Sequence, residues 1–103
     1  AMELALTGEM IGAERLYDYG LVNRLTEPDG ALAEAMHLAV QITENAPMSV
    51  ATSKRIITEQ IDWPLDRMCE IQASMTGHIL GSEDAREGAR AFAEKRSPNW
   101  KGR

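Results

Sequence analysis

Hydrophobic residues in this chain recur at the spacing of an α-helix over most of its length. Between residues 31 and 45 the apolar stripe consists of Leu32, Ala35, Met36, Ala39, Ile42 and Thr43. Residues 62–81 carry a second stripe at heptad-like spacing, made of Leu65, Met68, Cys69, Gln72, Met75 and Ile79. Side chains three and four positions apart share one face of a helix. Both stretches are therefore predicted to be amphipathic helices.

A shorter helix with well-marked ends is predicted over residues 11–21. Gly12 is a plausible N-cap, and Gly20 fits the left-handed position that follows the last turn. Leu21 would then fold back onto Leu16. Residues 1–6 look like the last turns of another helix, which is too short to persist alone and is expected to fray unless it docks.

Proline and acidic residues mark the next helix starts. Pro47 suits the first position of a helix that runs to about residue 60, and Asp62 is predicted to cap the helix that follows. Between the helices, residues 22–25 fit either a brief strand or a linker, and residues 28–30 form a turn. The fold class is therefore all-α, with five helices after the N-terminal turn.

The last predicted helix begins at Ser82, a good N-cap. One face of it carries mostly small residues, namely Ala85, Gly88, Ala89 and Phe92. Another helix is expected to approach closely there. Lys95 and Arg96 are placed in the last turn, where cations complement the helix dipole, and Pro98 stops the helix. Several apolar faces are wider than five short helices need, which indicates buried contacts outside this chain.

The composition is that of an ordinary globular protein. Hydrophobic residues make up 44% of the 103 residues and charged residues 26%, which argues against disorder. The net charge of −5 offers no general surface for nucleic acid, and no apolar run is long enough to span a membrane. The single cysteine, Cys69, excludes an internal disulfide and fits a reducing compartment. We therefore expect a cytoplasmic location.

Chemically reactive side chains form no catalytic or metal-binding constellation in the sequence. His37 and His78 are isolated, and a structural or solvent-facing role is favoured for both. Cys69 lies on an apolar stripe and is predicted to be a buried, inert thiol. A cluster of carboxylates, Glu83, Asp84 and Glu87, is explained by the positive end of a helix dipole. We name no catalytic residue and no metal ligand.

Residues 95–103 hold four basic side chains and no acidic one. Such a basic tail on an acidic protein is a candidate contact for an anionic group such as a phosphate. The alternative is a frayed, solvated terminus, which charge alone favours. Trp100 could anchor the tail to a neighbouring molecule.

Three runs of sequence resemble the enoyl-CoA hydratase/isomerase (crotonase) family. They are GARAFAEKRSPNWKGR at the carboxyl end, LTGEMIGAERLYDYGLVNRL near the start, and NAPMSVATSKRII between them. The last run resembles the carboxyl end of such enzymes. Leu16 departs from the alanine that is usual in the family, which implies slightly different local packing.

The resemblance implies a single helical segment over residues 1–103, the C-terminal, oligomerisation segment of a longer crotonase-fold enzyme. Residues 1–25 would end the core region, and residues 30–103 would form the C-terminal helices. In the family, the oxyanion hole and the catalytic carboxylates lie before the segment matched here. The positions that carry over are Phe92 and Lys95, which match a contribution to the coenzyme A site, often that of a neighbouring subunit. Their alternatives are core packing for Phe92 and a solvated helix-end cation for Lys95.

For the complete enzyme, the resemblance implies addition of water to 2-enoyl-CoA thioesters. Coenzyme A would be part of the substrate, and no further cofactor is expected. Double-bond isomerisation, acyl-CoA dehydration and hydrolysis are the alternatives within the family. Self-association as a trimer or a dimer of trimers is expected, without nucleic acid or membrane partners. The segment in isolation would be a non-catalytic assembly module, and an unrelated all-helical regulator is a third, weaker interpretation.

Overall fold

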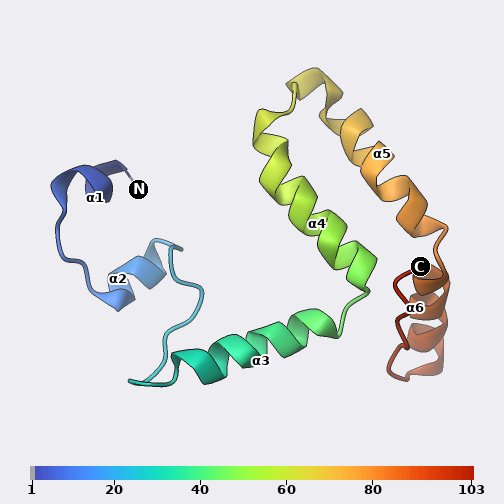
Figure 1. Ribbon diagram of the computed structural model, residues 1–103, viewed down its shortest axis with the longest axis horizontal. Helices are drawn as coiled ribbons and strands as arrows, with labels where there is room; N and C mark the ends of the chain where they lie inside the picture. Colours follow the sequence, from blue (N-terminus) through green and yellow to red (C-terminus); the bar gives the residue numbers. More distant parts are fainter. Residues whose placement is uncertain (1) are drawn as a thin grey trace. The chain divides into compact units, whose positions relative to one another are not determined.

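The computed structural model describes residues 2–103, and these residues form six α-helices and two short 3-10 helices without any strand (Figure 1). The all-α prediction is therefore confirmed, and residues 22–25 are a linker. By its contacts the chain divides into two units, of which the first ends at Ala39 and the second comprises Val40–Arg103. The division falls inside one helix, α3 (Ala31–Thr43).

The first unit contains α1 (Met2–Thr7), α2 (Ala13–Asp18) and the start of α3. The predicted ends of the short helix are confirmed, with Gly12 as its N-cap and Gly20 at a φ of 72°. Leu21 N donates to Leu16 O at 2.9 Å, and Gly20 N donates to Tyr17 O at 2.9 Å. These two bonds complete the reversal that a left-handed residue after a helix permits.

A turn leads from the linker into α3. Gly30 N donates to Glu27 O at 3.0 Å, and Asp29 has a φ of 66°. Pro28 pre-sets the backbone for the first central position of this turn, and Asp tolerates the left-handed second position. Arg24 also pairs with Glu34 of α3 at 3.3 Å. The turn predicted at residues 28–30 is thus confirmed.

The second unit contains α4 (Pro47–Glu59), α5 (Met68–Leu80) and α6 (Glu83–Glu94). Pro47 is the first residue of α4, as predicted. The prediction that Asp62 caps α5 is wrong, because Asp62 ends a 3-10 helix, η1 (Gln60–Asp62), and a second one, η2 (Leu65–Arg67), precedes α5. The Trp63–Pro64 step between them is extended, since proline disfavours helical backbone in the residue before it. Figure 1 shows α4 and α5 side by side, joined by these turns.

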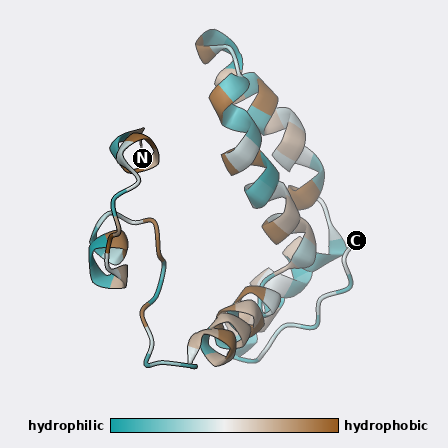
Figure 2. Ribbon diagram, turned by 60° about the vertical axis from the view of Figure 1, so that its left-hand side comes forward, coloured by the Kyte–Doolittle hydropathy of each residue, from teal (hydrophilic) through white to brown (hydrophobic). Residues whose placement is uncertain are grey.

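Burial is scarce among the described residues. Ala91 on α6, 2% exposed, is the one buried hydrophobic residue between residues 2 and 103. Large apolar side chains remain exposed on every long helix, including Leu32, Met36, Val40, Ile57, Leu80 and Phe92. Hydrophobic and hydrophilic positions alternate along the helices (Figure 2). Cys69 is exposed, so its predicted burial is wrong, although Met75 and Ile79 of the same apolar stripe are half-buried.

Candidate functional site

The amino end of α6 carries a buried carboxylate, for which the helix dipole alone is not a sufficient explanation. Ser82 caps the helix as predicted, because its Oγ accepts the N–H of Ala85 at 3.0 Å. Asp84 follows in the first turn and is only 1% exposed. A buried carboxylate is costly unless hydrogen bonds satisfy it. Asp84 therefore needs partners beyond the favourable field of the helix dipole.

Those partners come from the last residues of the chain. Asp84 Oδ1 accepts the backbone N–H of Lys101 at 2.7 Å, and Oδ2 accepts that of Gly102 at 2.9 Å. In return, Asp84 N donates to Arg103 O at 3.1 Å. Gly102 adopts a φ of 72°, which glycine allows at no steric cost. The tail, defined as residues 97–103, thus folds back along α6. The expectation of a frayed terminus is wrong.

Trp100 fixes the middle of the tail. Its indole Nε1 donates to the carbonyl oxygen of Glu44, just beyond α3, at 2.8 Å. Its ring lies against Gly88, where an added Cβ would come within 3.2 Å of Trp100 Cη2. The small residue predicted to admit another helix therefore admits this indole instead. Trp100 thus anchors the tail to other residues of its own chain.

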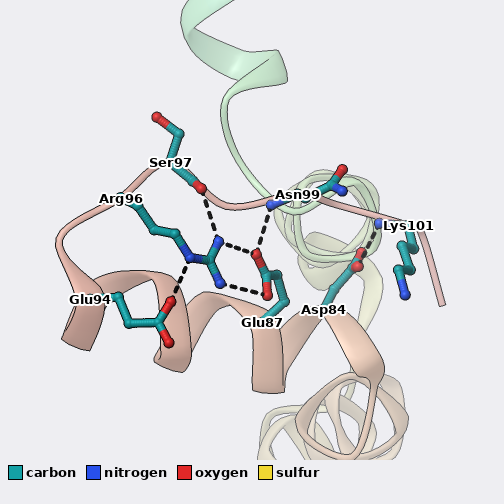
Figure 3. A network of polar contacts seen from close by, with 7 residues as sticks. All are labelled: Asp84, Glu87, Glu94, Arg96, Ser97, Asn99 and Lys101. Carbon is teal, nitrogen blue, oxygen red and sulfur yellow. Dashed lines mark hydrogen bonds and ion pairs between the residues drawn. The ribbon is translucent and has the colours of Figure 1, made fainter.

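Glu87 and Arg96 form the centre of a second polar network (Figure 3). Glu87 Oε1 and Oε2 accept Arg96 Nη1 and Nη2 at 2.6 and 3.1 Å, and Oε1 also accepts the backbone N–H of Asn99 at 2.9 Å. Arg96 further donates to Glu94 Oε2 at 2.6 Å and to Ser97 O at 3.1 Å. One guanidinium group therefore ties the interior of α6 to the start of the tail.

These contacts favour the charged form of both partners. The hydrogen bonds from Arg96, and then that from the Asn99 N–H, lower the pKa of Glu87 to about 2. The hydrogen bond to Glu87, followed by that to Glu94, raises the pKa of Arg96 further above its usual value. Bidentate arginine–carboxylate pairs fix geometry as well as charge. The network is thus a charged clamp on the turn after α6.

Lys95 occupies that turn. The helix ends at Glu94, and Lys95 adopts a left-handed conformation with φ 53° and ψ 42°. The prediction that Lys95 and Arg96 lie in the last helical turn is therefore wrong, and Pro98 is not what ends the helix. Lys95 N donates to Phe92 O at 3.2 Å, and Arg96 N donates to Ala91 O at 3.0 Å. In this pattern of backbone hydrogen bonds at a helix end, the left-handed position is usually occupied by glycine.

Both residues named for the coenzyme A site are open to an incoming ligand. Phe92 is 88% exposed, so core packing within this chain does not explain it. Lys95 is exposed as well, and no hydrogen bond or ion pair engages its ammonium group among residues 2–103. The two lie three positions apart, at the carboxyl end of α6 and in the turn after it. Together they present an aromatic ring and a free cation.

Two basic residues of the tail are partly neutralised. Lys101 and Arg103 both reach Glu83, each at 3.4 Å, and the hydrogen bond from Lys101, then the charge of Arg103, lowers the pKa of Glu83. A hollow of about 430 Å³ beside α6 is lined by both signs of charge, including Arg86, Arg90 and Glu87. It has no single-sign field for an anion. Lys95 is the better candidate for a phosphate contact.

The remaining candidates stay apart from one another. His37 lies 3.8 Å from Glu34, its neighbour on α3. His78 lines a shallow hollow with Met48 and Arg55. Within residues 2–103 no group of three potential metal ligands converges. In the same range, each helix is too short or too polar to cross a bilayer.

Known proteins similar to this chain point to one family. The sequence profile described as enoyl-CoA hydratase/isomerase matches residues 1–103. The chain belongs to the enoyl-CoA hydratase/isomerase family. Carnitinyl-CoA dehydratase from Escherichia coli K12 is 38% identical over 105 residues, which cover 98% of this chain and 40% of that protein. The corresponding enzyme of Salmonella typhi is 37% identical over the same length.

Solved structures agree with the family assignment. Enoyl-CoA hydratase EchA1 from Mycobacterium marinum superposes with a TM-score of 0.95 at 52% identity, covering 99% of this chain and 40% of that one. An enoyl-CoA hydratase from Mycobacterium tuberculosis H37Rv gives a TM-score of 0.95 at 50% identity, with the same coverage. The helical chain is thus similar to part of crotonase-fold enoyl-CoA hydratases. It spans about 40% of the length of the relatives it matches.

Sequence reasoning missed the residues that hold the site in place. Asp84 and Glu87 were assigned to the helix dipole, and Arg96 to the last turn. A signal was available, because Asp84, Glu87 and Gly88 share one side of a helix that is followed by a tail rich in backbone donors. Gly88 interrupts an otherwise helix-forming run, and such a glycine often marks a close approach. The backbone N–H groups of the tail were thus available as hydrogen-bond donors to Asp84 and Glu87.

Proposed function

We propose that this chain serves as the C-terminal segment of an acyl-CoA enzyme that adds water to 2-enoyl-CoA thioesters. The observation that carries the proposal is the pair Phe92 and Lys95, exposed and unpartnered in a chain that belongs to the enoyl-CoA hydratase/isomerase family. The pair supplies part of the coenzyme A site. Residues 1–25 end the core region of the complete enzyme, and residues 30–103 form its C-terminal helices.

The chemistry of the two side chains suits the nucleotide end of coenzyme A. Lys95 offers three N–H donors and a full positive charge to a phosphate. Phe92 offers a ring on which adenine stacks, an interaction worth roughly 1–3 kcal/mol per base in other proteins. Both contacts would form in substrate and transition state alike, so they serve binding more than turnover.

The chain supplies no catalytic group in this proposal. Thioester enolates are stabilised by paired N–H donors, and carboxylates move the protons or activate water. In the family that this chain resembles, both are expected before the segment matched here. Coenzyme A arrives as part of the substrate, and we propose that the reaction takes place in the cytoplasm without a further cofactor.

Dehydration of an acyl-CoA is the second candidate reaction. It is favoured by the carnitinyl-CoA dehydratases of Escherichia coli and Salmonella typhi, which are 38% and 37% identical over nearly the whole chain. Hydration and dehydration are the same addition in opposite directions, so one site catalyses both. Isomerisation and thioester hydrolysis on the same scaffold remain the further alternatives. Phe92 and Lys95 would bind coenzyme A in each of them.

We also propose that the segment contributes to self-association, as a trimer or a dimer of trimers. Its many exposed large apolar side chains on α3, α4 and α5 favour this, since extensive exposed apolar surface is typical of an interaction site. In isolation, the segment would act as an assembly module without catalysis. The two roles are compatible within the complete protein, meaning the polypeptide in which this chain occurs in the cell.

Steady-state kinetics of the complete protein test the coenzyme A proposal. Lys95→Ala is expected to raise KM for a short 2-enoyl-CoA by about tenfold or more, with kcat little changed, because a charged hydrogen bond is worth roughly 1.5–3 kcal/mol. Lys54→Ala, at another exposed lysine on α4, is the matched control. An unchanged KM, with unchanged salt dependence, would refute the role of Lys95. If the complete protein does not hydrate 2-enoyl-CoA but acts on another acyl-CoA, the proposed reaction is wrong and the proposed coenzyme A site is unaffected.

A further inference from the structure

We propose that Glu87 and Arg96 are positioning residues that set Lys95 in its binding direction through the left-handed turn at the end of α6. The inference rests on the proposed role of Lys95 in coenzyme A binding. It names two residues that touch no substrate themselves. Their contribution follows from three features of the structure, namely the backbone at Lys95, the clamp around Arg96 and the free end of the lysine side chain.

The backbone at Lys95 requires external support. Left-handed geometry is unfavourable for a residue that carries a Cβ, and φ at Lys95 is 53°. Two backbone hydrogen bonds flank this residue, since Lys95 N donates to Phe92 O before it and Arg96 N donates to Ala91 O after it. Whenever this helix end opens, extended or helical conformations of Lys95 compete. Each of them would send the lysine side chain in a different direction.

The Arg96 side chain adds a second restraint on the carboxyl side of Lys95. Its guanidinium group reaches back to Glu87, two turns earlier in α6, through paired bonds of 2.6 and 3.1 Å. It also holds Ser97 O at 3.1 Å, and Glu87 holds Asn99 N at 2.9 Å. Figure 3 shows these bonds converging from both sides of the turn. The residues on either side of Lys95 are therefore fixed to one rigid helix.

The clamp leaves the lysine ammonium group free. Arg96 is engaged by Glu87, Glu94 and Ser97, whereas no partner engages Lys95 Nζ among residues 2–103. The two adjacent cations, Lys95 and Arg96, thus have different roles. Arg96 holds the backbone, and Lys95 remains available to an anion. Preorganisation of this kind improves affinity by removing the cost of ordering the group on binding.

Exposure distinguishes Glu87 from the other carboxylates of the helix. Its side chain is 17% exposed, compared with 46% for Glu83 and 52% for Glu94. Glu83 lies one turn before Glu87 and pairs with Lys101 and Arg103 at 3.4 Å, without contact to Arg96. Glu83 is therefore a matched control of the same residue type on the same helix.

The decisive experiment is a double-mutant cycle on the complete protein, with KM and kcat for a short 2-enoyl-CoA as readouts. Glu87→Gln keeps the size of the side chain and an acceptor for Asn99 N–H, so folding is expected to persist. It should raise KM about 3–10-fold at nearly constant kcat, and this effect should vanish in a Lys95→Ala background. Alanine carries a Cβ, so it leaves the left-handed cost at residue 95 unaltered. Glu83→Gln should change neither parameter.

Arg96→Lys provides a second variant that keeps the charge and loses the paired geometry. It should raise KM in the same direction, again only when Lys95 is present. If the effect of Glu87→Gln persists undiminished without Lys95, or if KM does not change in either clamp variant, the positioning role is wrong while the coenzyme A proposal stands. If Lys95→Ala itself leaves KM unchanged, both proposals fail.

Discussion

Residues 82–103, in which the tail folds back along α6 and which we call the carboxyl-terminal hairpin, differ from helices α3 to α5 in how they are stabilised. In the hairpin, side-chain carboxylates satisfy the backbone donors of the tail, and Trp100 fills the space over Gly88. Helices α3 to α5 leave many large apolar side chains in solvent, such as Leu32 at 75% and Ile57 at 67% exposed, whereas on α6 Phe92 alone is a large exposed hydrophobic residue.

The difference concerns which interactions a segment completes by itself. Hydrogen bonds need a defined partner at a defined distance, and residues 82–103 contain both partners of each hydrogen bond that their side chains make, except that of Trp100 Nε1, which donates to Glu44 O. An apolar face needs area to pack against, which residues 2–103 supply only in small part. The hairpin is thus held mostly by its own contacts, whereas the apolar helices leave faces that the proposed self-association would cover. The residues proposed for the coenzyme A site, Phe92 and Lys95, belong to the hairpin.

The largest expected effect comes from charging an apolar face. Leu32→Glu in the complete protein should weaken self-association by about 100-fold or more, because an unpaired charge buried at an interface costs several kcal/mol. Sedimentation velocity would detect smaller species at the same protein concentration. The charge change Glu83→Gln on the hairpin serves as the control. An unaltered sedimentation profile for Leu32→Glu would show that α3 is not part of an interface.

The hairpin should respond most strongly at Asp84. Asp84→Ala removes the acceptor of two backbone N–H groups, and each buried group left unpaired costs roughly 1–3 kcal/mol. We expect a loss of about 2–4 kcal/mol in the free energy of unfolding, measured by urea denaturation. Asp84→Asn, which keeps one acceptor oxygen, should lose less. A change below about 0.5 kcal/mol would mean that the tail is held by other contacts.

The contact between Trp100 and Gly88 should make the effects of mutating these two residues depend on each other. Trp100→Ala should cost about 2 kcal/mol, since it removes the packed indole and its bond to Glu44 O. Gly88→Ala alone should be close to neutral, because a gain in helix propensity of about 1 kcal/mol offsets crowding of the indole. In the Trp100→Ala background the same change should stabilise by about 1 kcal/mol. Additive effects would contradict the contact between these residues.

Acid should loosen the hairpin gradually, the smallest of the expected effects. The pKa of Glu87 is lowered from its ordinary value of 4.5 to about 2 in the folded chain. A depressed carboxylate pKa stabilises the fold above the unfolded value, and this contribution is lost as the pH falls from about 4.5 toward 2. Glu87→Gln should flatten the pH dependence of the melting temperature in that window. An identical slope in wild type and variant would contradict the assignment.

Local signals predicted most of the fold. The reversal after α2 follows from Gly20, and the starts of α4 and α6 follow from Pro47 and Ser82. These features depend on residues a few positions apart, so the sequence contains them directly. The start of α5 was misplaced because Pro64 breaks the chain into two short turns before the helix can form.

The site was harder to predict, because its supports connect distant residues. Trp100 meets Glu44 across 56 positions, and Lys101 meets Asp84 across 17. Nothing in a lysine side chain signals a left-handed backbone, and at Lys95 the surrounding contacts impose it. Phe92 and Lys95 were named from resemblance to the family. Their exposure, and the clamp beside Lys95, required the structure.

Direct binding of coenzyme A tests the central claim most simply. Calorimetric titration of coenzyme A into the complete protein and its Lys95→Ala variant, at low and high salt, isolates the lysine–phosphate contact. We predict about tenfold weaker binding for the variant at low salt, with a smaller difference at high salt because ions screen the exposed charge pair. Equal dissociation constants for both proteins at both salt concentrations would contradict a role for this segment in coenzyme A binding through Lys95.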